Sequence, residues 1–489
     1  MSSTSSRFDI PEDILDHNFG LDSQINEDID LSKFETIQQD AYFPTPDEML
    51  KATKKGLLYI GAEFNEDKKF VGHGFVQTFE YTMHQVLYAT SGGGKTEKQK
   101  FDLMNLMIQK DMADTLNKDI KNPDDKIKVF DAFIFDNLGN FRNFGEPILQ
   151  KNPEFLKFYL KSGWDPDYLR SLGPKWVRKY RPNYLKKVGL WRNAVVIPNL
   201  ESIIDLLEYM VLLGAEVNLI RGQLYEVLDE MNIFDDEDLR ENFVFKEFIE
   251  QLEVIKNRSR YEARKGEDSK QKEAGFKRVS IVDQVISPLK KLERKYHNVY
   301  DIPTFEDNKI TIMDGLNSED QWLFHISALS HVLENFVILE KNLQSIKILV
   351  QTDEYGNVIK DAAIQGTNST SKRESRFANY MRDLILKLIA IGRNYGLGVY
   401  LATQNPGQML IKEGRQFASI QNKWIGYLGT EIDKMRENNK GGSSFGPELE
   451  TVMKESSKGG WISEKRTGQW LLIQDQKVRR ILTWMPCYN

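Results

Sequence analysis

The chain has 489 residues, of which 40% are hydrophobic and 28% charged, so we expect a globular protein with two or three structural units. Its N-terminus lacks a secretory signal, and no stretch approaches the roughly 18 continuous apolar residues that span a bilayer. A single cysteine, Cys487, excludes an internal disulfide. The net charge of −6 argues against nucleic acid coating the whole surface but permits a local basic channel. We therefore expect a cytoplasmic protein.

Residues 1–55 differ from the rest of the chain in charge. The first 50 residues hold twelve acidic side chains and only two basic ones. This composition is typical of a solvated, partly disordered arm. Apolar residues such as Phe8, Ile14 and Phe19 lie between the acidic ones. This pattern also suits an arm that docks on a protein partner. Both interpretations of residues 1–50 stay open.

The first signs of regular structure follow this arm. Residues 56–61 and 74–79 read as short strands around a charged turn, and residues 84–88 as a third strand. Apolar residues recur at nearly helical spacing over 96–117. A glycine-rich segment, 89–96, joins the third strand to this helix. Strand, glycine loop and helix in this order form the context that a phosphate-binding motif requires.

Further strand signals are spread over the remainder of the chain, at 129–136, 309–313, 346–350, 399–403 and 469–473. Because strands alternate with helical segments, the sequence predicts an α/β fold with a mainly parallel sheet and helices on both faces.

The region 145–300 interrupts this alternation. It is mostly helical in pattern, and its segment 256–279 is charged and poor in apolar residues, which predicts a mobile basic excursion. We therefore expect four parts: an acidic arm at 1–55, the first part of the sheet domain at 56–144, a helical insertion domain at 145–300, and the second part of the sheet domain at 301–489.

The segment 89–96 reads Ala-Thr-Ser-Gly-Gly-Gly-Lys-Thr. Backbone N–H groups of such a turn converge on an anion, and the following helix adds its positive end. Lys95 would reach the β- and γ-phosphates of ATP, and the Thr96 hydroxyl would bind Mg²⁺. The predicted nucleotide-binding residues are Ser91, Gly92, Gly93, Gly94, Lys95 and Thr96.

A pair of acidic residues, Asp353 and Glu354, ends the apolar run at 346–350. Alone, this pattern would indicate a strand followed by an acidic turn. Beside a phosphate loop, it predicts that Asp353 helps to hold Mg²⁺ and that Glu354 polarises the attacking water as a general base. Asp136, which also ends a strand, is a weaker candidate for the same neighbourhood.

Gln404 and Arg393 flank the predicted strand at 399–403. Ligands gather at the carboxyl edge of an open α/β sheet, so Gln404 can sense the γ-phosphate there. Arg393 precedes the strand and should face away from its own nucleotide. It is either a surface arginine at a helix C-terminus or an arginine that serves the nucleotide of a neighbouring subunit.

Together these residues resemble the HerA/FtsK superfamily of ring-shaped DNA-pumping ATPases. The likeness lies in the Ala-Thr-Ser-Gly-Gly-Gly-Lys-Thr loop, the strand that ends in Asp-Glu, and the pattern Arg-x2-Gly-x6-Thr-Gln-x-Pro. It covers 56–140 and 305–489. The superfamily includes conjugative coupling proteins, type IV secretion ATPases and some viral packaging motors.

The resemblance implies a RecA-like P-loop NTPase core that uses ATP and Mg²⁺. By position it assigns metal binding to Thr96 and Asp353, catalysis to Glu354, the sensor role to Gln404, and a trans-acting finger to Arg393. Some relatives carry Asp-x2-Gly-Glu after the second strand of the core, whereas this chain has Asn140 at the last position, so the base must be Glu354.

Three functions follow from this interpretation. The first is an ATP-driven ring, expected by analogy to be a hexamer, that translocates DNA in transfer, packaging or processing. The second is a type IV secretion-like ATPase that moves or docks protein substrates, with the acidic arm as docking element and a membrane complex as partner, although the chain has no predicted span of its own. The third is a nucleotide-gated switch.

A basic and aromatic segment at 157–192 is a candidate nucleic-acid surface. It holds ten basic residues against two acidic ones, and aromatic residues lie between them: Trp164, Tyr168, Trp176, Tyr180, Tyr184 and Trp191. Lysine and arginine neutralise phosphates, and aromatic rings stack on unpaired bases. The same pattern also describes a helical unit with an aromatic core and a solvated basic face.

Overall fold

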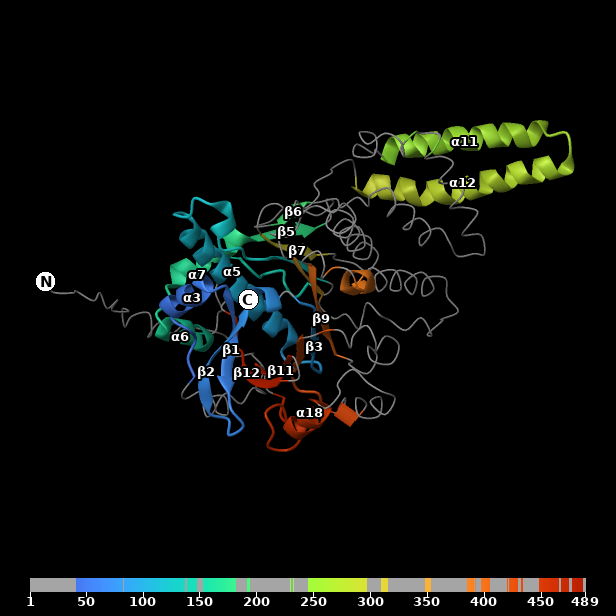
Figure 1. Ribbon diagram of the computed structural model, residues 1–489. Helices are drawn as coiled ribbons and strands as arrows, with labels where there is room; N and C mark the ends of the chain where they lie inside the picture. The colour runs from blue at the N-terminus through green and yellow to red at the C-terminus, as the bar shows by residue number, and fades with distance from the viewer. Residues whose placement is uncertain are drawn as a thin grey trace, which may run out of the picture. The chain divides into compact units, whose positions relative to one another are not determined.

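The computed structural model describes the chain in several stretches, which together contain a single large sheet (Figure 1). The described residues are 41–81, 83–136, 139–146, 153–181, 191–193, 245–296, 309–314, 348–352, 385–390, 397–404, 422–429, 448–465, 468–474 and 477–486, with a few isolated positions between them. All of the elements below belong to the unit Tyr42–Asn489.

The sheet has twelve strands in the order β2-β1-β12-β11-β10-β3-β9-β8-β4-β7-β5-β6. They are β1 (Leu57–Phe64), β2 (Phe70–Gln77), β3 (Gln85–Tyr88), β4 (Asp131–Asp136), β5 (Val177–Arg181), β6 (Trp191–Asn193), β7 (Ile310–Asp314), β8 (Ile348–Thr352), β9 (Leu397–Thr403), β10 (Asn422–Ile425), β11 (Gln469–Gln474) and β12 (Lys477–Leu482). Pairing is parallel from β10 through β6 and antiparallel from β10 to β2. The prediction of a mixed α/β fold with a mostly parallel sheet is therefore confirmed.

The central strands of the sheet are buried. Every residue of β3, β4 and β9 is buried, as expected for parallel strands that are covered on both faces. Helix α5 (Lys95–Asn117) is itself buried over most of its length. It packs against β1, against α3 (Pro46–Lys54) and against α7 (Pro166–Trp176). In the described residues, no helix is long and apolar enough to cross a membrane.

Helix α3 occupies the last part of the segment that the sequence assigns to the acidic arm. Its capping box is complete, because the Glu48 N–H donates to the Thr45 hydroxyl at 3.3 Å and the Thr45 N–H donates to the Glu48 carboxylate at 2.8 Å. The Trp164 indole N–H donates to the Pro44 carbonyl at 2.7 Å. Residues 42–54 are thus part of the folded unit. The arm's residues 1–40 lie outside the described residues.

The region 145–300 contributes strands as well as helices. After α6 (Pro153–Lys161) and α7, strand β5 pairs in parallel with β7, and β6 pairs with β5. The sequence shows little strand signal there, because β5 reads Val-Arg-Lys-Tyr-Arg and its three charged residues mask the pattern of a strand. The proposed domain boundaries stay predictions, but an entirely helical insertion is not what the structure describes. Helix 200–213, expected from the sequence, lies outside the described residues.

Two long helices, α11 (Phe245–Lys265) and α12 (Ser269–Tyr296), pack against each other as a hairpin (Figure 1). They include the segment 256–279, which is helical in the structure; its expected mobility stays a prediction. Apolar residues do line the contact, among them Leu252, Ile255 and Val282. At Gly275 an added Cβ would lie 2.7 Å from the Ala263 Cβ, so the helices approach closely near the turn.

Candidate nucleotide-binding site

The predicted phosphate loop lies between β3 and α5, at the carboxyl edge of the parallel part of the sheet. Strand β3 has parallel neighbours on both sides, β10 and β9. Helix α5 begins at Lys95, with Gly94 as its N-cap. The sequence predicted this order of strand, loop and helix because all of its signals are local.

All three glycines of the loop are required by its shape. Gly92 and Gly94 have φ angles of +70° and +81°, which residues with a Cβ adopt at a cost of about 1–2 kcal/mol. Gly93 is needed for a different reason: an added Cβ would lie 2.9 Å from the Ala89 Cβ and 3.0 Å from the Thr90 oxygen. The Gly93 N–H closes the turn by donating to that same oxygen at 3.0 Å.

Lys95 lies across this turn with its side chain buried. Its ammonium donates to the Ala89 carbonyl at 3.1 Å and to the Thr90 carbonyl at 3.4 Å. Ser91 and Gly92 are exposed at the tip of the loop, and Thr96 is half-buried in the first turn of α5. A positive side chain, a helix N-terminus and a glycine turn therefore meet at one point, and such a set of donors fits the phosphates of a nucleotide.

Two neighbouring segments hold the start of the loop. The Thr90 N–H and hydroxyl both donate to the Tyr427 carbonyl, at 2.9 and 3.1 Å. The Ala89 N–H donates to the Thr403 carbonyl at 3.4 Å. Thr403 is the last residue of β9 and is paired in register with Tyr88, the last residue of β3.

This register brings Gln404 to the loop. It follows Thr403 directly, so the predicted sensor and the phosphate loop leave adjacent parallel strands at the same level. Gln404 is half-buried. Of the three residues predicted to act in catalysis, it is the one that lies in the described part of the chain.

Strand β8, which precedes the predicted acidic pair, is also at this edge. It lies between β9 and β4, with Thr352 paired to Leu401 on one side and to Phe135 on the other. Asp353 and Glu354 follow Thr352 in the sequence but lie outside the described residues, as does Arg393. Within the described ranges, no group of three or more histidine, cysteine or acidic side chains could hold a metal ion.

Asp136, the weaker candidate for metal binding, has a structural role. It is fully buried at the end of β4, and its two carboxylate oxygens accept the backbone N–H groups of Asn140 and Phe141, each at 2.9 Å. These bonds close the turn after the strand. A carboxylate that caps a turn with both oxygens is poorly placed to coordinate an ion.

A buried ionic group lies one turn into α5, and sequence reasoning missed it. The Lys98 ammonium lies 2.5 and 2.6 Å from the two oxygens of Asp102, and the Tyr400 hydroxyl donates to Asp102 at 3.1 Å. The same ammonium lies 3.7 Å from the ring centroid of Trp424, whose indole N–H donates to Gln85 at 2.9 Å. The group therefore ties the phosphate-loop helix to β9, β10 and β3.

Burial controls the ionisation of this group. It lowers the pKa of Lys98 below its ordinary value, although the carboxylate of Asp102 opposes the change. Burial also raises the pKa of Tyr400, and the nearby Asp102 carboxylate adds to that effect. The sequence signal that could have revealed the pair is the i, i+4 spacing of a lysine and an aspartate on an otherwise buried helix.

The basic and aromatic segment at 157–192 is mostly structural where the chain is described. Trp164, Trp176 and Tyr180 are buried in the core. Two of its basic residues form ion pairs within the protein. The ammonium of the buried Lys179 lies 2.9 Å from the Glu146 carboxylate, and the Lys175 ammonium lies 2.7 Å from the carboxylate of Asp111 and 3.0 Å from that of Asp114. The aromatic-core interpretation therefore holds for residues 157–180.

Comparisons with known proteins give no family model and no curated protein that matches the chain. Among solved structures, VirB4 of Thermoanaerobacter pseudethanolicus aligns with a TM-score of 0.46 and 14% identity, over 87% of this chain and 96% of that one. The pCW3 conjugation coupling protein TcpA, in a monomer form with ATPγS, aligns with a TM-score of 0.33 and 9% identity, over 91% of this chain and 70% of that one. Both TM-scores lie below 0.5, so the function has to be inferred from the chain's own residues.

Proposed function

We propose that this chain is a Mg²⁺-dependent ATPase with a RecA-like P-loop core. The observation that carries the proposal is the loop at 89–96. Two of its glycines adopt left-handed angles, a third admits no side chain, and the Lys95 ammonium is held against the turn. It lies at the carboxyl edge of a parallel sheet, where α/β proteins bind their ligands.

The proposed roles follow from this arrangement. Lys95 and the backbone N–H groups of the loop bind the phosphates, and Thr96 and Asp353 hold the metal ion. When bound, Mg²⁺ would supply positive charge that offsets the negative charge of the phosphates. Glu354 accepts a proton from the water that attacks the γ-phosphate, and Gln404 responds to the loss of that phosphate through β9, which pairs with β3.

We further propose that the enzyme assembles as a ring, a hexamer by analogy with the HerA/FtsK superfamily, and that Arg393 completes the site of a neighbouring subunit. An arginine supplied in this way raises the rate of related phosphoryl transfers about 10³–10⁵-fold. The proposed cargo is DNA.

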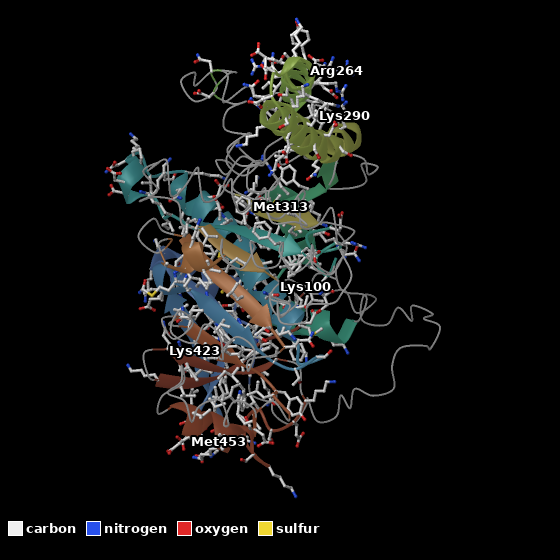
Figure 2. All side chains as sticks on the ribbon, turned by 90° about the vertical axis from the view of Figure 1, so that its right-hand side faces the viewer. Lys100, Arg264, Lys290, Met313, Lys423 and Met453 are labelled. Carbon is white, nitrogen blue, oxygen red and sulfur yellow. The ribbon has the colours of Figure 1, made fainter. Side chains whose placement is uncertain are left out.

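Support for DNA as cargo comes from the turn of the α11–α12 hairpin. Residues 258–278 hold eight basic and four acidic side chains. Two aromatic side chains are exposed there, Tyr261 at 57% and Phe276 at 53%, and the Lys265 ammonium lies 4.5 Å from the Tyr261 ring centroid. Figure 2 labels Arg264 beside this turn. Exposed aromatic rings among basic side chains suit stacking on bases and contacts to phosphates.

Hydrolysis is tested on the full chain with Lys95→Ala and Glu354→Gln. We expect each to lower ATP turnover at least about 100-fold. Lys118→Ala is the matched control, because Lys118 is an exposed lysine just beyond the end of the same helix. A wild-type protein that neither binds nor hydrolyses ATP would refute the proposal.

The cargo is tested by adding DNA. We expect it to stimulate ATP hydrolysis severalfold, and the double change Arg264→Glu and Lys272→Glu to weaken DNA binding by about tenfold or more at low salt. The same reversal of charge at Lys118 and Lys121, which are exposed elsewhere, should have little effect. If DNA gives no stimulation at any length or salt concentration, a protein cargo becomes the better hypothesis. Hydrolysis without movement of either cargo would favour a nucleotide-gated switch.

A further inference from the structure

Lys465 contacts the phosphate loop from the C-terminal part of the chain. A Cβ added at Gly92 would lie 2.8 Å from the Lys465 Cε and 2.9 Å from its Nζ. The ammonium group of Lys465 therefore rests against the exposed tip of the loop. Gly92 has a φ of +70° and belongs to the predicted phosphate loop, whose backbone N–H groups would bind an anion.

The segment that carries Lys465 is firmly anchored. Helix α18 (Glu448–Ser456) is followed by a turn in which Trp461 is buried, and the Trp461 indole N–H donates to the Trp470 carbonyl at 3.0 Å. The Trp461 backbone N–H donates to the Glu455 carboxylate at 2.8 Å. That carboxylate in turn forms a buried ion pair with Arg480 of β12. The backbone is therefore anchored at Trp461, four residues before Lys465, by the packing of its side chain and by the buried ion pair of Glu455 and Arg480.

Lys465 forms no ion pair with any residue in the described part of the chain, and its side chain is exposed. A second exposed lysine of the same segment, Lys458, lies seven residues earlier and is not among the nearest atoms to an added Cβ at Gly92. Lys465 and Lys95 thus place two cations at one glycine turn, and two cations suit a ligand that carries several negative charges.

We propose that Lys465 is a second phosphate-binding lysine of the nucleotide site. It contacts the phosphates bound at the loop and so couples occupancy of the site to the turn 457–465. This inference rests on the proposed function, because it requires that the loop binds a nucleotide. Sequence reasoning could not find it, since nothing in the local pattern around Lys465 distinguishes it from a surface lysine.

The test measures binding of ATPγS and of AMP to the full chain by calorimetry. We expect Lys465→Ala to weaken ATPγS binding by about tenfold, which corresponds to about 1.4 kcal/mol, with a much smaller effect on AMP. Lys465→Arg, which keeps the charge, should stay within about twofold of wild type. Lys458→Ala is the matched control and should bind as wild type does.

A second readout separates a direct contact from a general loss of folding. ATPγS should slow hydrogen exchange of residues 457–465 in the wild type but not in Lys465→Ala, while the unfolding temperature of the variant without nucleotide stays unchanged. Unchanged or tighter ATPγS binding by Lys465→Ala would overturn the inference. The proposed function would still stand in that case if Lys95→Ala abolished ATPγS binding in the same assay. Failure of the wild type to bind ATPγS would instead reject the proposed function itself.

Discussion

Replacing Lys98 with methionine should destabilise the protein strongly. Lys98 and Asp102 are 1% and 3% exposed, and the ammonium lies within 2.6 Å of both carboxylate oxygens. Methionine matches the length of the side chain but leaves the buried aspartate without its cation. Removing one partner of a buried ion pair typically costs about 3–5 kcal/mol, and the contact with the Trp424 ring is lost as well. Against a typical stability of about 5–15 kcal/mol, this is a large fraction.

The measurement is urea-induced unfolding followed by circular dichroism. The matched control is Arg170→Met, which removes an ion pair whose side chains are 47% and 85% exposed, and we expect it to cost no more than about 1 kcal/mol. The double variant Lys98→Met, Asp102→Leu should lose less than the sum of the two single changes, because no isolated charge remains. A cost of under about 1 kcal/mol for Lys98→Met alone would refute the reasoning.

Two further predictions concern the loop and its surroundings. Gly93→Ala should weaken ATP binding by at least about tenfold, because the new Cβ meets the Ala89 side chain and the Thr90 oxygen. The control is Gly72→Ala in β2, where the φ of +149° strains an added side chain but no atom lies within 4 Å of it; this variant should bind ATP as the wild type does. Calorimetry checks both variants. Burial opposes ionisation of Glu455, but the hydrogen bonds from Arg480 and from the backbone outweigh it and hold its pKa below the ordinary 4.5. The carboxylate therefore stabilises the fold above about pH 4.5 and loses this effect as the pH falls through the lowered pKa. Thermal unfolding should show Glu455→Gln less stable than wild type at pH 7, with the difference shrinking below pH 4.5; a constant difference at all pH values would contradict this.

The sequence by itself determined the features whose causes are local. The strand at 85–88, the glycine turn and helix α5 follow from residues adjacent in the chain, and so the phosphate loop was predicted in place. The parallel part of the sheet followed from apolar runs separated by helices. The close relation of Gln404 to the loop was also predictable, because parallel strands present their carboxyl ends at one edge.

Only the tertiary structure decided which charged side chains are structural. Lys98 and Lys179 look like surface lysines in the sequence, yet both are buried against carboxylates. Strand β5 and the helices at 256–279 carry too many charges to be predicted from the hydrophobic pattern alone. Lys465 reaches the phosphate loop from a turn near the other end of the chain. Burial, ion pairing and contacts between distant segments depend on how the elements pack, and a local pattern of residues does not contain that information.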